Sequence, residues 1–334
     1  MTLATTRLGR TGLTVSRLAL GTMTFGLQTE ESVARQILDK AAHGGINFLD
    51  TADVYPLGGG LKTIGATEEI LGRWLRDAPG GRAGFVVATK AFGRTGPHPW
   101  DQGSSRKHLL DAIDASLARL QTDYVDLYQL HGDDTRTPLD ETLEALDTIV
   151  RSGRARYVGV SNFLAYRLAR ALGKSELHGL VRFVSVQPRY SLLFREIERE
   201  LLPLAQDEGL GVIPYNPLAG GLLTGKHRRG APTEGTRFTL GTAAERYQER
   251  YWADRYFDTV DALHALAKEA GVSLTTLSVA WVLANPLVTA PLLGASRPDQ
   301  LDDTLAASGY VLDAGLKQRL DELTQVYRWG DSAR

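Results

Sequence analysis

Apolar strand-like runs and amphipathic helix-like segments alternate along almost the whole chain of 334 residues. The strand-like runs end at or near Gly21, Asp50, Lys90, His131, Ser161, Gln187, Tyr215 and Gly294. Strands that are joined by helical crossovers lie parallel, and eight such units close into a (β/α)8 TIM barrel. The alternation therefore predicts an α/β chain whose residues 1–334 form a single (β/α)8 barrel domain.

The main alternative is an open, doubly wound sheet, which also alternates strands with helices. That fold carries a glycine-rich phosphate loop after its first strand, whereas residues 19–26, "ALGTMTFG", contain no G-x-G-x-x-G pattern. The closed barrel is therefore the better prediction. Ahead of its first strand, two short strand-like runs on either side of Gly12 predict an N-terminal β-hairpin.

The interval between Tyr215 and Gly294 is too long for one crossover. It holds helical patterns at 258–271 and 273–286 and, before them, residues 218–252, which are rich in glycine, threonine and arginine. Long loops on the C-terminal face of a barrel are usually functional, so we expect 218–252 to cover a ligand. A surface insertion without a function is the alternative.

Composition excludes several classes of protein. The chain has no cysteine, which rules out disulfides and thiolate metal sites. A formal net charge of -1 gives no reason to expect nucleic acid or a membrane as partner. The N-terminal "MTLATTRLGR" lacks the apolar core of a signal peptide, and no apolar run approaches the length of a membrane span. We therefore expect a cytoplasmic protein.

Four polar side chains lie at the ends of three consecutive strands. Asp50 ends the second strand, Tyr55 follows in its loop, and Lys90 and His131 end the third and fourth. Adjacent strands are about 4.8 Å apart, so these side chains should converge on the barrel face that carries active sites. Alone, each has an ordinary explanation, such as a surface lysine or a turn cap. Together they predict a catalytic group, because buried aspartate and lysine must be paired.

The chemistry of this group suits the reduction of a carbonyl. A phenol has a pKa of about 10, and we expect Lys90 to lower the pKa of Tyr55 while Asp50 keeps Lys90 charged. His131 would orient the substrate oxygen. Tyr55 would then give its proton to that oxygen as a hydride reaches the carbon.

The sequence resembles the aldo-keto reductase superfamily over essentially its whole length, in the branch of the aflatoxin-aldehyde reductases and channel β subunits. The segments that carry the resemblance are "NFLDTADVY", "VVATK", "VDLYQLH", "VGVSNF", "VQPRYSLL", "PYNPLAGGLLTGK" and "GASRPDQLDDTL", in the order of the family. The resemblance implies an NADPH-dependent aldehyde or ketone reductase. It also implies that Tyr55 is the general acid and base, that Asp50 and Lys90 tune it, and that His131 orients the carbonyl.

The resemblance further implies an extended NADP(H) site on the barrel face. From the nicotinamide to the adenosine, the implied contacts are Gly21, Thr22, Met23, Asp50, Ser161, Asn162, Gln187, Tyr215, Asn216, Pro217, Leu218, Gly220, Lys226, Gly294, Ser296, Arg297, Gln300 and Asp303. Tyr215 would stack on the nicotinamide, and the glycines after it would let backbone N–H groups reach the pyrophosphate.

Two basic residues of this set, Lys226 and Arg297, motivate a preference for NADPH over NADH. Thr304 stands where many relatives have asparagine, so we expect weaker contacts to adenine.

The substrate pocket is expected to be aromatic, lined by Phe25, Phe92 and Trp100 beside Tyr55 and His131. Residues 93–107 are glycine-rich and predict a second mobile wall, although Trp100 has the alternative role of anchoring that loop. The sequence leaves the carbonyl substrate itself open.

Two other functions remain open. One is a cofactor-sensing binding module, since the family includes channel-associated β subunits. The other is a metal-dependent barrel hydrolase or isomerase that uses Asp50, His131, Asp133 and Asp134. Such sites usually have several histidine ligands, and no H-x-H pattern occurs among the seven histidines, so we expect no metal.

Overall fold

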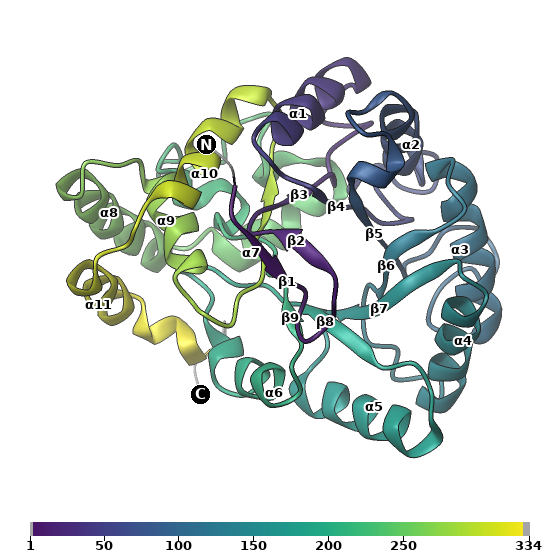
Figure 1. The fold of residues 1–334 in the computed structure, drawn as a ribbon. Helices are drawn as coiled ribbons and strands as arrows, with labels where there is room; N and C mark the ends of the chain where they lie inside the picture. Colours follow the sequence, from purple (N-terminus) through teal and green to yellow (C-terminus); the bar gives the residue numbers. More distant parts are fainter. Residues whose placement is uncertain (1–2, 330–334) are drawn as a thin grey trace.

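The computed structural model describes residues 3–329, in which an eight-stranded parallel sheet is surrounded by helices (Figure 1). In spatial order the strands are β10 (Leu292–Gly294), β3 (Ala19–Gly21), β4 (Phe48–Asp50), β5 (Val86–Ala91), β6 (Val125–Leu130), β7 (Ala155–Ser161), β8 (Phe183–Gln187) and β9 (Gly211–Val212). The sheet closes because Thr289 N–H donates to the Val212 carbonyl and Leu292 N–H to the Pro214 carbonyl, both at 2.8 Å. The predicted (β/α)8 barrel is confirmed.

Apart from α7 (Ala244–Tyr251), which lies in the long segment after β9, the helices pack their apolar faces against the outside of the barrel and form the main core with it. These helices are α1 (Glu31–His43), α2 (Ala66–Asp77), α3 (Arg106–Leu120), α4 (Leu139–Arg151), α5 (Ala165–His178), α6 (Leu201–Asp207), α8 (Asp254–Glu269), α9 (Leu274–Leu283), α10 (Leu301–Ala306) and α11 (Ala314–Leu323). Side-chain oxygens cap three of their N-termini, Ser105 on α3, Ser273 on α9 and Asp313 on α11.

One predicted helix is shorter than its sequence pattern suggests. The pattern runs over 197–209, whereas α6 begins at Leu201 after a separate 3-10 turn, Glu196–Glu198. Pro203 explains the break, because a proline ring clashes with the carbonyl of the residue four positions earlier in a continuous helix.

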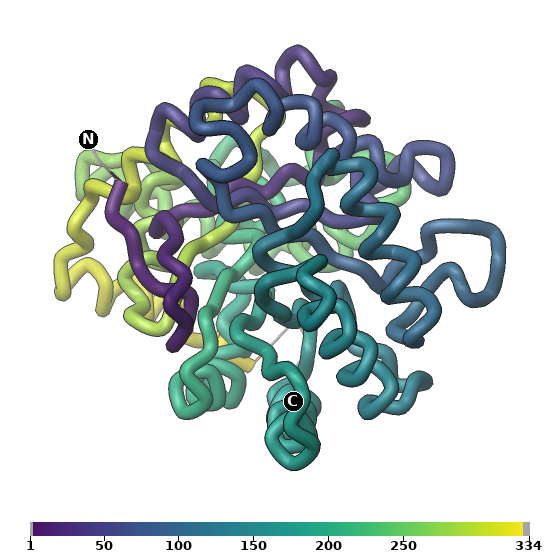
Figure 2. The backbone as a smooth tube through the Cα atoms, turned by 45° about the vertical axis from the view of Figure 1, so that its right-hand side comes forward, coloured from purple at the N-terminus to yellow at the C-terminus, as the bar shows by residue number. Residues whose placement is uncertain are grey.

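The predicted hairpin, β1 (Thr5–Arg7) and β2 (Thr14–Ser16), lies across the N-terminal end of the barrel (Figure 1). Leu8 and Val15 are completely buried and pack with Phe48, Leu127 and Ile213 in an interior cluster that is separate from the main core. This apolar cluster fills the interior at the N-terminal end of the barrel. The polar ends of the strands are left at the C-terminal face, where the loops after β4 and β5, residues 51–65 and 92–105, project from the barrel (Figure 2).

Residues 218–252, which we call the lid, contain more helical structure than their sequence predicts. They include α7 and the 3-10 turns Arg237–Thr239 and Gly241–Ala243. The ring of Phe238 packs 5.0 Å from His227 and 4.6 Å from Trp252, between ring centroids. The lid therefore has a small aromatic core of its own. Helix α7 is not predicted from the sequence, because it is short and mostly polar.

The lid reaches across the barrel face to the loops on its far side. Gln28, in the loop after β3, donates an amide N–H to the Gly235 carbonyl at 2.9 Å. Gly241 packs against Gly58 in the loop after β4, where a Cβ on Gly241 would lie 2.7 Å from the Gly58 carbonyl oxygen. The segment that leaves β9 thus contacts the loops of the first two barrel strands. Within residues 3–329, no helix has the length and apolar character needed to cross a membrane.

Candidate active site

A buried ion pair lies at the centre of the C-terminal face. Asp50 is 2% exposed and Lys90 is 0% exposed, and Lys90 Nζ pairs with Asp50 Oδ1. The ammonium also donates to the Thr51 carbonyl at 2.9 Å. An ammonium carries three N–H groups, so one remains for another acceptor. Lys90 Nζ lies 5.2 Å from the centroid of the Tyr55 ring.

Two glutamine amides hold the other carboxylate oxygen of the pair. Asp50 Oδ2 accepts an N–H from Gln129 at 3.0 Å and one from Gln187 at 2.8 Å. The Gln187 amide also donates to Gln129 Oε1 at 3.2 Å. Gln129 is not among the site residues predicted from the sequence. The signal was present, because Gln129 lies two positions before His131, which puts both side chains on the inner face of one strand.

Tyr55 and His131 face each other beside this ion pair. Their rings meet edge to face, with centroids 5.6 Å apart and an interplanar angle of 78°. Burial, helped by the negative charge of Asp50, raises the pKa of the Tyr55 phenol well above its usual range. The expectation of a lowered pKa is therefore wrong as a net effect. The physical reason is that desolvation of the buried phenol outweighs the nearby positive charge.

The imidazole of His131 is neutral at physiological pH. Burial lowers its pKa to about 3, and the positive charges of Lys90 and Arg246 act in the same direction. A protonated phenol and a neutral imidazole thus lie together. This pair can donate two hydrogen bonds to one substrate oxygen without placing a second cation in the site.

The residues expected to hold a carboxamide form one hydrogen-bonded chain next to His131. Ser161 donates its hydroxyl to the Gln187 carbonyl at 2.9 Å. Asn162 donates to Ser161 Oγ and to the His131 carbonyl, both at 3.0 Å, and accepts the Tyr215 hydroxyl at 2.8 Å. The structure therefore brings the ends of β6, β7 and β8 together with the segment after β9.

The residues after β3 lie on the other side of the ion pair. The backbone N–H and the hydroxyl of Thr22 both donate to the Asp50 carbonyl at 3.0 Å. Gly21 is the register partner of Asp50, and the Met23 carbonyl accepts the Leu57 N–H at 3.1 Å. Gly21, Thr22 and Met23 thus border the Asp50 strand end directly.

The loop after Tyr215 has a backbone suited to an anion. Ala219, Gly220 and Gly221 follow one another with φ of 48°, 71° and 104°, and such left-handed residues turn N–H groups into a shared concavity. A Cβ on Gly220 would lie 2.8 Å from the Tyr247 ring, so only glycine fits there. The amide nitrogen of Asn216 is buried without a partner among the described residues, and is free for a ligand.

Three cations gather beyond this loop. Burial lowers the pKa of Lys226, and the charges of Arg297 and Arg237 lower it further. Arg237 belongs to the lid, and its Nη2 lies 3.8 Å from where a Cβ on Gly294 would stand. Arg237 cannot be recognised from the sequence, because no local motif distinguishes it from other surface arginines. The lid brings it next to a strand end that is 57 positions away along the chain.

The segment expected at the adenosine end begins with a structured turn. Ser296 N–H donates to Gln300 Oε1 at 2.8 Å, and the exposed Arg297 pairs with Asp299 at 3.2 Å. Asp303 is exposed on α10. Thr304 is buried and donates to the Leu301 carbonyl at 3.0 Å, so its hydroxyl is used inside its own helix.

The three aromatic residues expected around the substrate differ in position. Phe25 is completely buried in the main core and has no exposed surface, so it is a packing residue and the expectation that it lines the pocket is corrected. Phe92 is partly exposed and lies against Gly132, next to His131. Trp100 is 48% exposed and stacks on His98, with centroids 4.8 Å apart, in the loop after β5.

The carboxylates considered for a metal site are engaged elsewhere. Asp133 pairs with Arg167 at 2.9 Å, and Asp134 accepts the Ser104 N–H at 2.8 Å and the Thr137 hydroxyl at 2.7 Å. Across residues 3–329, no three histidine, aspartate or glutamate side chains are grouped to hold a metal ion.

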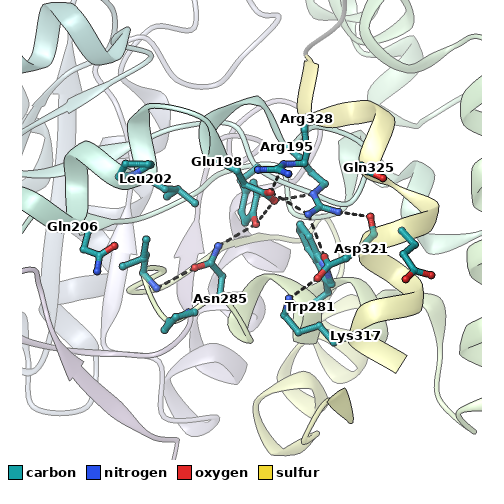
Figure 3. Close-up of a pocket in the computed structure, with 15 residues that line it drawn as sticks. Arg195, Glu198, Leu202, Gln206, Trp281, Asn285, Lys317, Asp321, Gln325 and Arg328 are labelled. Atoms are coloured by element: carbon teal, nitrogen blue, oxygen red, sulfur yellow. Dashed lines mark hydrogen bonds and ion pairs between the residues drawn. The ribbon is translucent and has the colours of Figure 1, made fainter. Parts of the chain in front are cut away.

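A groove of about 560 Å³ lies on the outer wall, between α6, α9 and α11 (Figure 3). Its charged groups pair with one another: Arg195 contacts Glu198 at 2.7 Å and Asp321 at 3.2 Å, and Asp321 also accepts the Trp281 indole N–H at 2.9 Å. None of the residues predicted for the active site lines this groove. Its ion pairs fasten α11 to the barrel.

Comparison with known proteins agrees with this geometry. The sequence model of the Aldo/keto reductase family matches residues 17–325. The chain is 42% identical to an uncharacterized oxidoreductase, YrpG, of Bacillus subtilis, with 95% of each chain covered. It is 37% identical to a probable voltage-gated potassium channel subunit beta of Arabidopsis thaliana, with 90% and 89% covered. It is 34% identical to the L-glyceraldehyde 3-phosphate reductase of Escherichia coli, with 90% and 86% covered. The chain is an oxidoreductase that belongs to the aldo/keto reductase family.

Proposed function

We propose that this protein reduces a small aldehyde or ketone to the alcohol with NADPH. The observation that carries the proposal is the pair of Tyr55 and His131, in edge-to-face contact beside the buried ion pair of Asp50 and Lys90. Tyr55 keeps its proton at neutral pH and His131 stays uncharged. A carbonyl oxygen held between them receives one hydrogen bond from each.

The chain's own residues have distinct tasks in this reaction. His131 orients the carbonyl oxygen, and Tyr55 transfers its phenolic proton to that oxygen. Lys90 supplies positive charge beside the phenolate that remains, and Asp50 holds Lys90 in place. Bound NADPH would supply the hydride that reaches the carbonyl carbon.

The residues of the barrel face fit such a cofactor. Ser161, Asn162 and Gln187 would hold the carboxamide, and Tyr215 would cover the nicotinamide. The left-handed backbone at Ala219–Gly221 and the unpartnered amide of Asn216 suit the pyrophosphate. Lys226, Arg237 and Arg297 together favour the extra phosphate of NADPH. The lid would cover the bound molecule.

The test is the oxidation of NADPH at 340 nm with 4-nitrobenzaldehyde as substrate. The wild type should turn over, and Tyr55→Phe should lose at least about 100-fold in kcat, because it lacks the transferred proton. The variant should still bind NADPH, as measured by nucleotide fluorescence. Retained turnover in Tyr55→Phe would show that another group is the acid.

A second candidate is a binding module that senses the cofactor. The similarity to a protein named as a channel subunit beta supports it. This candidate predicts tight NADPH binding without turnover over a panel of aliphatic and aromatic aldehydes, which the same assay measures.

A further inference from the structure

His227 lies inside the lid and is 4% exposed. Its ring meets the rings of Phe238 and Trp252 edge to face, with centroid distances of 5.0 and 5.5 Å. Both ring nitrogens are buried, and neither has a hydrogen-bond partner within residues 3–329. A phenylalanine would fill this place without burying an unpartnered polar atom, which destabilises a protein. Packing alone therefore does not account for a histidine here.

One of these two nitrogens faces the loop after Tyr215. A Cβ on Gly221 would lie 3.6 Å from His227 Nε2 and 4.0 Å from Lys226 Nζ. These are ordinary contact distances, so the space next to Gly221 is large enough for an atom of a ligand. Gly221, with a φ of 104°, ends the left-handed run that begins at Ala219. The imidazole and the ammonium therefore border the same point of the loop that suits the pyrophosphate.

Aromatic rings of the lid cover the loop beside this point. A Cβ on Gly220 would lie 2.8 Å from the ring of Tyr247 and 3.4 Å from the ring of Phe238. Phe238 also contacts His227, so the same ring lies against the loop and against the imidazole. The rings exclude water from this side of the loop, and a hydrogen bond in such surroundings is stronger than one in water.

The surroundings of His227 suit an anion. An imidazole without a partner can also bind a metal ion, but the ammonium of Lys226 at the same point would repel a cation. In the part of the chain that the structure describes, no three histidine, aspartate or glutamate side chains are grouped to hold a metal ion. Burial and the charge of Lys226 lower the pKa of His227 to about 4, so the imidazole is neutral and has one N–H to donate.

We propose that His227 donates its Nε2–H to the pyrophosphate of the bound nicotinamide nucleotide, at the point of the loop that Lys226 also borders. This inference rests on the proposed function, because the ligand is the cofactor of that reaction. The contact connects the aromatic core of the lid directly to the cofactor. Since the pyrophosphate is common to NADPH and NADH, His227 should strengthen the binding of both nucleotides.

The experiment measures dissociation constants and does not depend on turnover. Wild type, His227→Phe and His227→Gln are titrated with NADPH and with NADH, and nucleotide fluorescence reports binding. His227→Phe keeps an aromatic ring in the lid but has no donor, so the dissociation constants of both nucleotides should rise about 10-fold. His227→Gln has an amide N–H with a similar reach, and should stay within about 3-fold of the wild type.

A matched control and a measurement on the unsubstituted protein complete the test. His264→Phe makes the same substitution at an exposed histidine beside Gly225, and should leave both dissociation constants unchanged. In wild-type protein labelled with 15N-histidine, the NMR signal of His227 Nε2 should shift when either nucleotide saturates the protein. Its absence from the spectrum of His227→Gln identifies this signal.

The outcomes separate this contact from the proposed function. Wild-type affinity of His227→Phe for both nucleotides, or an Nε2 signal that does not shift, would overturn the contact and leave the reductase standing. Weaker binding of NADPH alone would assign His227 to the extra phosphate and overturn the contact with the pyrophosphate. A glutamine variant as weak as the phenylalanine variant would also overturn it, because the shape of the ring would then matter and its N–H would not. Failure of the wild type to bind either nucleotide would contradict the proposed function itself.

Discussion

Gln129 donates an amide N–H to Asp50 Oδ2 at 3.0 Å, so a residue outside the predicted catalytic group holds the carboxylate of the buried ion pair. The Gln187 amide donates to the same oxygen and to Gln129. In the proposed function Gln187 also holds the cofactor. The three side chains therefore connect the cofactor site to the ion pair beside Tyr55.

Substitution of Gln129 should reveal this positioning role. Gln129→Leu removes the donor to Asp50 and the acceptor for Gln187, and should lower kcat about 10-fold with a weaker NADPH affinity. Gln129→Glu keeps the shape but places a second carboxylate beside Asp50, so it should lower kcat more than leucine does. Steady-state kinetics and NADPH titration measure both effects. A glutamate variant that is more active than the leucine variant would indicate that only shape matters.

The pH profile of carbonyl reduction should be flat over a wide range. The pKa of His131 is lowered to about 3 by burial, so the imidazole stays neutral as the pH falls through its usual titration range. Burial raises the pKa of Tyr55, so the proton donor stays protonated as the pH rises. We expect kcat to change less than about 3-fold between about pH 5 and pH 9. A break near pH 6.5 that disappears in His131→Gln would show that the imidazole titrates normally.

Arg237 should contribute to the choice of cofactor. It lies with Lys226 and Arg297, and the proposed function assigns this group to the phosphate that distinguishes NADPH from NADH. Arg237→Met should raise the KM for NADPH about 10-fold and change the KM for NADH little. Arg229→Met is the control, because Arg229 also belongs to the lid but pairs with Asp258 at 2.6 Å. Equal effects on both cofactors would remove Arg237 from phosphate recognition.

We expect Asp53 to lower the free energy of unfolding at neutral pH. Burial, with the charge of Glu68, raises the pKa of this carboxyl well above its usual range, and no side chain among the described residues donates a hydrogen bond to it. The unfolded chain loses the proton near pH 4 and the folded protein only at higher pH, so stability falls as the pH rises between the two. Asp53→Asn does not titrate, and should raise the free energy of unfolding at pH 8 by about 1–3 kcal/mol.

Thermal or urea unfolding at pH 5 and pH 8 measures this difference. The advantage of Asp53→Asn over the wild type should shrink at the lower pH. A variant that is less stable than the wild type at pH 8 would mean that the carboxyl is ionised and stabilising in the folded protein.

The architecture of this protein could be predicted from its sequence. So could the convergence of Asp50, Tyr55, Lys90 and His131 at the C-terminal face of the barrel. The predicted strand ends at Gly21, Asp50, Ser161, Gln187 and Gly294 are those of the structure, and β5 and β6 end within one residue of Lys90 and His131. These strand ends can be predicted because the signal for them is local in the sequence. Apolar periodicity records which residues are buried, and a parallel barrel gathers every strand end on one face.

The tertiary structure decided which side chains share a cavity and how water is excluded from them. Gln129, Arg237 and helix α7 gain their places through contacts between distant segments, such as the bond between Gln28 and Gly235, 207 positions apart. The burial of Phe25 and the direction of the pKa of Tyr55 depend on the same packing. Desolvation is set by everything that surrounds a group, and a linear pattern does not contain that information.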